Sequence, residues 1–478
     1  MKYLLVEPAT QARAYNIALM KYTRWCEDNG HEYQYVRGIL KPDIVPDKIL
    51  MSCIFTYYSK KYEKTIDYYL KMFPKASVLV GGVFPSLFPD WFDKSKWNNP
   101  LMDERVKVHR FMDPNIEDLI PKWNVKVKDE DLFKSENMKK KAEARYNQIV
   151  MYASRGCVNK CGYCAVPKLE GDMHSFRSIR KFIETGMKEL PDAKSIVLYD
   201  NNFTEHAYFN DICDELRDSG IPVDIHGLHV DAFTKEKAKK MAELTYGSQG
   251  KKQSTAYLRF SFDKMKYKDN VHRALRYTKE ADIKASFFCY LLFNWIDSPL
   301  DFWKRIVYSQ VMVDDVQRDI YLFPQRYEPF DALEKYQYVG KHWTDQLAKG
   351  ARRTATWLHG FLPVTRSHNI YNWIGYNYDE FLNTLNHMGE NSKNRLEKKK
   401  GTPPTTEEVA VFGCNEDELE DRIRGSIEEG DSEENRIYKR IADNKREKLE
   451  NMEENHRKLH NMIENDEEIT DEMLNELV

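Results

Sequence analysis

The chain has 478 residues, of which 41% are hydrophobic and 13% aromatic, and its formal net charge is only −3. This composition is that of a folded globular protein of about three domains. It excludes a bilayer-spanning protein, because no apolar run approaches roughly 20 residues. It also excludes a disulfide-stabilised secreted protein, because eight cysteines are few for this length and no signal peptide begins the sequence. We therefore expect a soluble, cytoplasmic protein with no membrane partner.

Strand-like and helix-like stretches alternate over residues 1–112, which we predict to be the first domain. Strands are expected at residues 2–6, 33–36, 49–56, 77–80 and 106–109, and helices at residues 12–29 and 62–73. This alternation predicts a doubly wound parallel sheet, in which ligands bind beyond the carboxyl ends of the strands. Gly81 and Gly82 follow the fourth strand, where glycines let a flat ligand or a phosphate approach the backbone. The alternative is that they only form a tight turn.

A second domain is expected at residues 149–330, after a connector over residues 113–148. Its strands are expected at residues 149–153, 195–199, 223–226, 257–262, 285–293 and 319–323, with a helical stretch between each pair. Residues 331–400 are rich in aromatic side chains and are expected to form a C-terminal cap over this domain. Residues 401–478 are dense in charge and are expected to form a solvated, helical tail.

Three cysteines follow the first strand of the second domain. Cys157, Cys161 and Cys164 form a C-x3-C-x2-C run, and thiolates favour iron–sulfur clusters, zinc or cuprous ions. Three of them can hold three corners of a four-iron cluster, which leaves the fourth iron without a protein ligand. The alternative is a structural zinc site, which would need a fourth ligand. The nearest candidate for that ligand is His174.

This run resembles the signature of the radical S-adenosylmethionine (SAM) enzymes, in which an aromatic residue precedes the last cysteine, as Tyr163 does here. The resemblance implies that the three cysteines hold a [4Fe-4S] cluster and that SAM binds to the free iron. An electron from the cluster then cleaves SAM to methionine and a radical that functionalises a C–H bond, and a partner such as a flavodoxin or a ferredoxin supplies the electrons. The resemblance also implies an α/β fold in which residues 149–330 form a partial (β/α)6 TIM-like barrel.

The first domain resembles the cobalamin-binding Rossmann domain that precedes the barrel in many radical SAM enzymes. The likeness is carried by residues 78–86, VLVGGVFPS. In many of these domains an Asp-x-His-x-x-Gly run supplies a histidine to the cobalt. This sequence has no such run, and His31 and His109 lack that context. Two outcomes stay open: bound cobalamin followed by methyl transfer, or no cobalamin and a rearrangement or cyclisation.

A related radical SAM family, the methylthiotransferases, holds an additional cluster with three N-terminal cysteines. Only Cys26 and Cys53 precede Cys157 here, so the sequence disfavours that activity. Cys53 lies in an apolar strand, where a small core residue is expected. From a different class of function, a zinc-stabilised binding protein without catalysis also stays open.

The resemblance implies further cofactor-binding residues near the strand ends. The candidates, in chain order, are Tyr163, Asp200, Asn201, Asn202, Arg259, Ser261 and Asp263. The amino group of SAM would be met by Asp200, Asn201 and Asn202, and the alternative is that these residues form a turn. Arg259 on the fourth strand could bind the carboxylate of SAM, and Asp263 could bind its ribose. The alternative for that pair is a salt bridge lining the barrel.

Three further polar residues lie near the ends of the third and sixth strands, namely His226, His229 and Arg326. Histidine can transfer protons near neutral pH, and arginine can bind an anionic group, so these residues are candidates for contact with the substrate. The alternative for the histidines is a structural role. The substrate is expected to be a small molecule, a peptide or a nucleotide.

Overall fold

The computed structural model describes residues 1–8, 16–93, 105–129, 147–247, 256–330, 332–358, 360–366, 370–389 and Glu454. The expected tail over residues 401–478, apart from Glu454, lies outside the described residues, as do residues 130–146 of the connector and 390–400 of the cap. Contacts divide the chain into two units. The first comprises Met1–Leu258, Ile283–Ala285 and Glu328–Tyr338, and the second comprises Arg259–Asp282, Ser286–Tyr327 and Val339–Val478.

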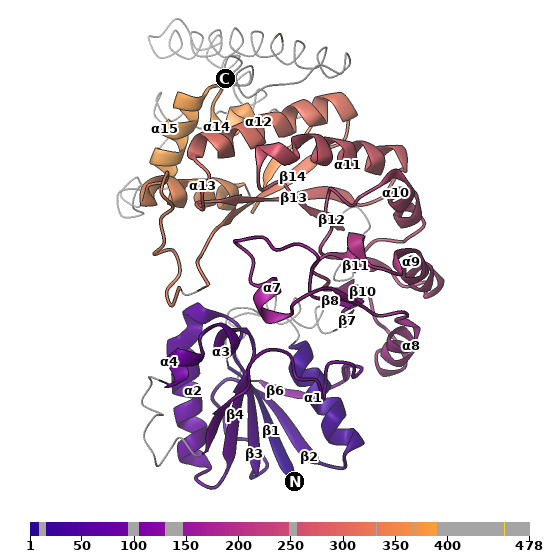
Figure 1. Ribbon diagram of the computed structural model, residues 1–478, viewed down its shortest axis with the longest axis vertical. Helices are drawn as coiled ribbons and strands as arrows, with labels where there is room; N and C mark the ends of the chain where they lie inside the picture. The colour runs from indigo at the N-terminus through magenta and orange to yellow at the C-terminus, as the bar shows by residue number, and fades with distance from the viewer. Residues whose placement is uncertain are drawn as a thin grey trace, which may run out of the picture. The chain divides into compact units, whose positions relative to one another are not determined.

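Within the described residues, the first unit begins with six parallel strands in the order β5-β4-β3-β1-β2-β6 (Figure 1). The strands are β1 (Lys2–Glu7), β2 (Glu32–Arg37), β3 (Lys48–Ser52), β4 (Ser77–Gly81), β5 (Val106–Val108) and β6 (Val127–Asp129). The helices around them are α1 (Ile17–Asp28), α2 (Ser59–Met72), α3 (Val83–Leu87) and α4 (Pro89–Asp93), with a 3-10 turn, η1 (Thr56–Tyr58). These parallel pairings confirm the prediction of an α/β protein with a parallel sheet.

Both faces of this sheet are buried because side chains alternate along each strand. Leu4 packs in the core that contains Ile66 of α2, whereas its neighbour Leu5 packs in the core that contains Leu19 of α1. Helix α1 begins at Ile17 because the side chain of Asn16 caps it, with Oδ1 accepting the N–H of Leu19 at 3.2 Å. The earlier start expected at residue 12 lies outside the described residues.

The second sheet of the first unit has three parallel strands in the order β11-β10-β7. These are β7 (Gln148–Met151), β10 (Ser195–Leu198) and β11 (Val223–Ile225). Every residue of the three strands is buried, as is typical of a parallel sheet covered on both faces. A short antiparallel pair follows β7, formed by β8 (Ser154–Arg155) and β9 (His174–Ser175). The helices are α7 (Val166–Leu169), α8 (Arg180–Glu189), α9 (Phe209–Asp218) and α10 (Lys235–Ala242), with the 3-10 turn η3 (Phe203–Glu205).

Part of the expected connector packs against β7 and α8. The indole N–H of Trp123 donates to the carbonyl oxygen of Val150 at 2.9 Å, and the backbone N–H of Trp123 donates to Glu189 Oε2 at 2.8 Å. Trp123 is only 2% exposed. The described part of the connector therefore belongs to the packed structure and is not a free linker.

The sheet of the second unit has the order β12-β13-β14-β15. Its strands are β12 (Tyr257–Ser261), whose first two residues belong to the first unit, β13 (Ser286–Phe293), β14 (Ile320–Arg326) and β15 (Leu362–Val364). The helices are α11 (Lys268–Glu280), α12 (Pro299–Val316), α13 (Asp345–Trp357), α14 (Tyr371–Ile374) and α15 (Tyr378–Gly389), with the 3-10 turn η5 (Met265–Tyr267). Strands β13 and β14 are parallel, and β15 is antiparallel to β14.

All six strands expected in residues 149–330 are present, as β7 and β10 to β14. They belong to two sheets, one in each unit, so their closure into a partial barrel stays a prediction. The antiparallel strand β15, in the expected cap, has no counterpart among the predicted strands because three residues carry too short a pattern to be recognised.

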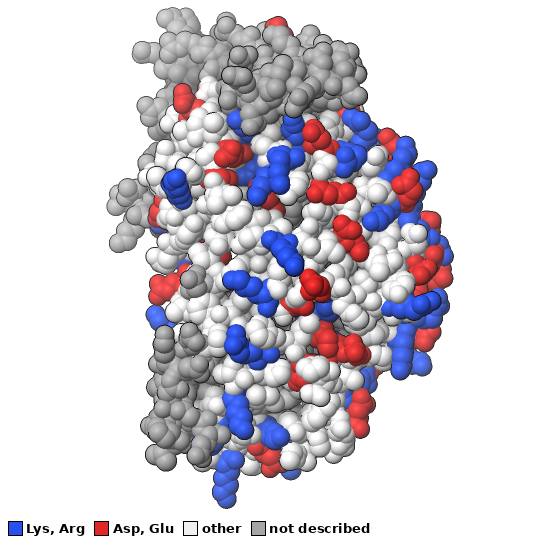
Figure 2. Space-filling view, in the orientation of Figure 1, with Lys and Arg blue, Asp and Glu red and all other residues white. Residues whose placement is uncertain are grey.

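No helix among the described residues is long and apolar enough to cross a membrane. Basic and acidic side chains are interspersed on the face shown in Figure 2. On α9 and α10, Arg217 and Lys240 each pair with both Asp214 and Glu243. Such exposed pairs add little to stability. Because opposite charges alternate, the surface of these two helices carries no large patch of one sign.

Candidate functional site

The cysteine loop, residues 156–171, is closed at its base. Strand β8 pairs with β9 so that Arg155 lies beside His174, and the N–H of Cys157 donates to the carbonyl of Gly171 at 3.4 Å. Gly156 has a φ of +74°, and a Cβ there would lie 2.2 Å from the carbonyl oxygen of Asp172. Only glycine fits this close approach of the two ends of the loop.

The three cysteines are half-buried thiols that form no disulfide. Cys157 Sγ accepts the backbone N–H of Asn159 at 3.4 Å and the Nδ2–H of Asn202 at 3.8 Å. Burial raises the pKa of the Cys164 thiol, against a backbone N–H from Val166 that lowers it. Soft sulfur donors on one loop, with N–H groups directed at sulfur, are the donor set that an iron–sulfur cluster requires.

A site for a single metal ion is not formed by any group of three His, Cys, Asp or Glu side chains in the part of the chain that the structure describes. His174, the candidate fourth zinc ligand, is exposed, and its ring lies edge-on to Phe176 at 5.7 Å between centroids. Tyr163, just before the last cysteine, is partly buried.

Glu170 ties the two ends of the cysteine loop together. Its Oε2 accepts the N–H of Gly156 at 2.8 Å and the Nδ2–H of Asn201 at 2.9 Å, and its Oε1 lies 3.1 Å from Arg155 Nη2. Arg155 Nε in turn lies 3.1 Å from Glu117 Oε1, and the guanidinium stacks 4.1 Å from the centre of the Tyr152 ring. A chain of ion pairs therefore connects the cysteine loop to the front part of the unit.

Asp200 holds the strand that leads into the loop. It is 3% exposed, and its two oxygens accept the N–H groups of Ala153, at 3.1 Å, and Ser154, together with the hydroxyl of Ser154 at 2.5 Å. Burial raises the pKa of Asp200 to about 6, although these hydrogen bonds and Arg155 oppose the shift. In the structure Asp200 positions the backbone before Cys157, and a contact with the amino group of SAM stays a prediction.

All three residues of the polar stretch after β10 thus contact the cysteine loop or the strand before it, as their position at a strand end predicts. The contacts are to the protein: Asp200 to Ser154, Asn201 to Glu170 and Asn202 to Cys157. The sequence pattern predicts that these residues lie at the end of the strand. It does not predict that their side chains form hydrogen bonds with other protein groups.

The histidines around β11 have different surroundings. His226 packs edge-on to Tyr199 at 4.9 Å and lies 3.9 Å from Asp224. The N–H of His229 donates to Thr204 Oγ1 at 2.9 Å, and its Nδ1 is buried without a hydrogen-bond partner among the described residues. His229 therefore keeps a ring nitrogen for a ligand, and contact of either histidine with substrate stays a prediction.

His206 is a buried histidine that the sequence does not single out. Its Nε2 lies 2.8 Å from the carbonyl of Ala153, and its Nδ1 accepts the N–H of Tyr208 at 3.1 Å. Nε2 is therefore the nitrogen that carries the proton, and burial lowers the pKa of the imidazole. Its position soon after the polar stretch at 200–204 is the one signal that could have indicated it.

The remaining predicted residues lie on the second unit. Asp263 Oδ1 accepts the N–H of Leu292 at 3.0 Å, which fixes the turn after β12. Arg326 has a side chain only 2% exposed and lies 3.7 Å from Asp345 Oδ1. Arg259 and Ser261 share one face of β12 and are half-buried. The roles of these residues toward SAM or substrate stay predictions.

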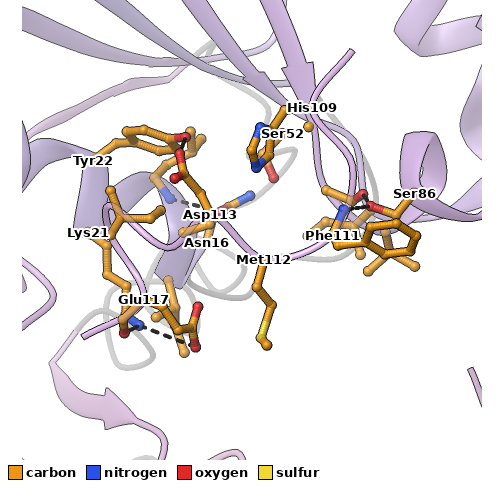
Figure 3. A pocket seen from close by; sticks show the side chains of 18 of the residues that line it. Asn16, Lys21, Tyr22, Ser52, Ser86, His109, Phe111, Met112, Asp113 and Glu117 are labelled. Atoms are coloured by element: carbon orange, nitrogen blue, oxygen red, sulfur yellow. Dashed lines mark hydrogen bonds and ion pairs between the residues drawn. The ribbon is translucent and has the colours of Figure 1, made fainter. Parts of the chain in front are cut away.

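A cavity of about 290 Å³ lies at the carboxyl edge of the front sheet (Figure 3). Its walls come from the start of α1, the ends of β3 and β4, residues 109–117 and, from the cysteine-loop side, Tyr152, Arg155 and Glu170. Gly81 and Gly82 line it, and their contact with a ligand stays a prediction. A Cβ on Gly82, whose φ is +105°, would lie 2.5 Å from the carbonyl of Cys53, so backbone packing alone explains that glycine.

Four side-chain atoms of cavity-lining residues have no hydrogen-bond partner among the described residues. Arg155 Nε and Glu117 Oε1 form an ion pair with each other, which leaves Asn16 Nδ2 and His109 Nε2. Asn16 is 4% exposed, and because its Oδ1 caps α1, its Nδ2 is the end of the amide that is left without a partner. The charged groups nearby are paired, Lys21 with Glu117 and Asp113 with the hydroxyl of Tyr22. Burial lowers the pKa of Lys21 to about 8.

The size of the cavity bears on whether cobalamin binds. Its volume of about 290 Å³ lies at the lower end of the range for small-ligand pockets, about 300–1,000 Å³. The glycine-lined wall suits a ligand at this edge of the sheet.

Comparison with known proteins gives one sequence match and several structural likenesses, and no family model matches the chain. The ribosomal protein uS12 methylthiotransferase RimO of Bartonella tribocorum is 32% identical in an alignment 108 residues long, which covers 18% of this chain and 25% of that protein. The chain thus matches a quarter of the length of this curated relative. Because the relative is a radical SAM enzyme, the match confirms the resemblance that the cysteine run indicates.

The structural likenesses are distant. The cobalamin-dependent SAM radical enzyme OxsB, with aqua-cobalamin and SAM bound, is 12% identical, with a TM-score of 0.47 over 97% of this chain and 72% of that one. SuiB of Streptococcus suis, bound to the precursor peptide SuiA, is 13% identical, with a TM-score of 0.32 over 63% of this chain and 67% of that one.

Proposed function

We propose that this chain is a radical SAM enzyme in which Cys157, Cys161 and Cys164 hold a [4Fe-4S] cluster. The observation that carries the proposal is one closed loop with three half-buried thiols, two N–H groups on Cys157 Sγ, and a position after a buried parallel strand. When bound, the cluster supplies the electron that cleaves SAM reductively, and the resulting radical chemistry functionalises a C–H bond of the substrate.

The protein's own residues prepare this loop. Glu170 closes its base, Asp200 holds the strand before it, and the N–H groups of Asn159 and Asn202 offset negative charge on Cys157. Such supporting contacts orient ligands and tune a metal site. For SAM, the proposed contacts are Arg259 for the carboxylate, and Ser261 and Asp263 for the ribose. Asp200 could accept from the amino group of SAM only with the lone pairs that Ala153 and Ser154 do not use.

Methyl transfer is a second candidate for the step after hydrogen abstraction, and the cavity with Asn16 and His109 favours it. A ligand site at the carboxyl edge of the front sheet is where a corrinoid cofactor would be expected. The relative RimO carries the name of a methylthiotransferase, but Cys26 and Cys53 are fully buried in the two cores of the front sheet. An additional N-terminal cluster on those two cysteines has no support.

The test is anaerobic reconstitution followed by metal, sulfide and product analysis. About four irons and four sulfides per chain, with formation of 5′-deoxyadenosine from SAM under a strong reductant or with reduced flavodoxin, would support the proposal. One zinc and no sulfide would contradict it and favour the binding protein. Corrinoid absorbance in the purified protein, with a methylated product, would separate methyl transfer from a rearrangement or cyclisation. Small molecules, peptides and nucleotides are the substrate classes to screen.

A further inference from the structure

The side-chain amide of Asn202 is built into the wall behind Cys157. The residue is 1% exposed, and its Nδ2 lies 3.8 Å from Cys157 Sγ. Its Oδ1 accepts the hydroxyl of Thr204 at 2.9 Å. Because the carbonyl end of the amide is held by this hydroxyl, the NH2 end must face the sulfur.

Thr204 is fixed in turn by the segment after β11. It is fully buried, and its Oγ1 accepts the backbone N–H of His229 at 2.9 Å. Its hydroxyl has two acceptors within reach, Asn202 Oδ1 at 2.9 Å and the carbonyl of His229 at 3.4 Å, and the shorter contact favours Asn202. The carbonyl oxygen of Thr204 also accepts Lys237 Nζ at 2.5 Å. The result is a directed chain of donors, from His229 N–H through Thr204 O–H and Asn202 N–H to Cys157 Sγ, within one unit of the molecule.

This arrangement differs from the role that the sequence pattern predicts for Asn202. An ammonium group of SAM needs an acceptor, whereas the carbonyl of Asn202 already accepts one hydrogen bond, from Thr204, and its amide presents a donor to Cys157. A donor suits a thiolate. Hydrogen bonds to the sulfurs of a cluster raise its reduction potential, because they stabilise the additional negative charge of the reduced form.

We propose that Asn202 tunes the cluster through Cys157, raising the midpoint potential of the [4Fe-4S] couple, and that Thr204 orients the amide for this purpose. The inference rests on the proposed function, since it requires the cluster. Asn202 is a positioning residue in this scheme and takes no part in the transfer of atoms. The backbone N–H of Asn159 supplies the second donor to the same sulfur.

The experiment measures the midpoint potential of the reconstituted cluster, without SAM, by a redox titration followed by electron paramagnetic resonance. Asn202→Leu removes the donor at similar volume and is expected to shift the midpoint to a more negative value. Thr204→Val leaves the amide in place but frees its orientation, so a smaller shift in the same direction is expected. Thr278→Val is the matched control, because Thr278 is also fully buried but donates only to Leu275 of its own helix.

The outcomes distinguish failure of the proposed function from failure of this inference. Wild-type protein without iron and sulfide would contradict the proposed function itself. Full iron and sulfide with the same midpoint in wild type, Asn202→Leu and Thr204→Val would overturn this inference alone. If Asn202→Leu assembles no cluster, the result depends on Thr204→Val. An unchanged midpoint in Thr204→Val would overturn the inference. A more negative midpoint in Thr204→Val, with no shift in Thr278→Val, would support it.

Discussion

The cysteine loop and the front-domain cavity lie in the same unit but differ in how their polar groups are satisfied. Around the loop, Asp200, Asn202 and Glu170 all have their hydrogen-bonding groups engaged by neighbouring protein atoms. At the cavity, Asn16 Nδ2 and His109 Nε2 have no partner among the described residues. The first pattern belongs to a site organised before its cofactor arrives, and the second to a site that leaves polar groups for a ligand to satisfy.

Replacing one loop cysteine is the strongest way to test this comparison. In Cys161→Ala we expect complete loss of the cluster and of 5′-deoxyadenosine formation, because two thiolates cannot hold the three corners. Iron analysis and product chromatography measure both. Cys213→Ala is the control. Cys213 lies on the buried face of α9 and is 1% exposed, so this variant should keep its full iron content. Equal iron in the two variants would show that the loop does not hold the metal.

Removing the charge of Glu170 tests whether the loop is organised in advance. In Glu170→Gln the pair with Arg155 is lost and the acceptor for Gly156 is weakened, so we expect iron to be held about 10–100-fold less tightly. The rate of iron loss to a chelator measures this. Glu189→Gln is matched, because Glu189 also accepts a backbone N–H and pairs with Arg24 but does not contact the loop. Similar iron loss in both variants would contradict the role of Glu170.

The raised pKa of Asp200 predicts a pH dependence of stability in the iron-free protein. Its folded value, about 6, exceeds the usual aspartate value of about 3.9. Its contribution to stability is therefore fully present below about pH 4 and is lost as pH rises through about 6, a change of about 2–3 kcal/mol in the free energy of unfolding. Urea unfolding at pH 4 and pH 7.5 measures most of this change. Asp200→Asn should be less stable throughout but should lack this decrease, and an equal slope in both proteins would refute the assignment.

The smallest effect is expected at the cavity. Asn16→Ser keeps a side-chain oxygen that can cap α1 and removes the amide donor, so the free energy of unfolding should change by less than about 1 kcal/mol. If a corrinoid uses this cavity, its affinity should fall by about tenfold, the equivalent of one hydrogen bond. Equilibrium dialysis with hydroxocobalamin measures the affinity. Unchanged binding would place that ligand elsewhere.

The local features of this protein could be read from the sequence with some success. The spacing of Cys157, Cys161 and Cys164 and their place after a strand depend only on neighbouring residues, and the alternation of strands and helices gave the parallel sheets. The position of Asp200, Asn201 and Asn202 beside the loop follows from the shared edge of parallel strands.

What the sequence could not provide depends on contacts between distant residues. Glu170 meets Gly156 and Asn201 only because the loop folds back on itself, and Thr204 orients Asn202 only in the context of His229. His109 reaches the cavity from the end of β5, without the motif that usually marks a cobalt-binding histidine. No periodicity or spacing signals such pairings.

The packing of Trp123 bears on how such proteins can be recombined. Its indole caps a carbonyl of β7, and Glu117 from the same segment neutralises Arg155 at the base of the metal loop. A gene fusion that exchanged the front domain at residue 112 and discarded the segment behind it would strip a donor from Val150 and a counter-charge from Arg155. The front domain and the second sheet should therefore be exchanged only together with the segment between them. Chimaeras that keep residues 113–129 with the second sheet should fold more readily than those that do not.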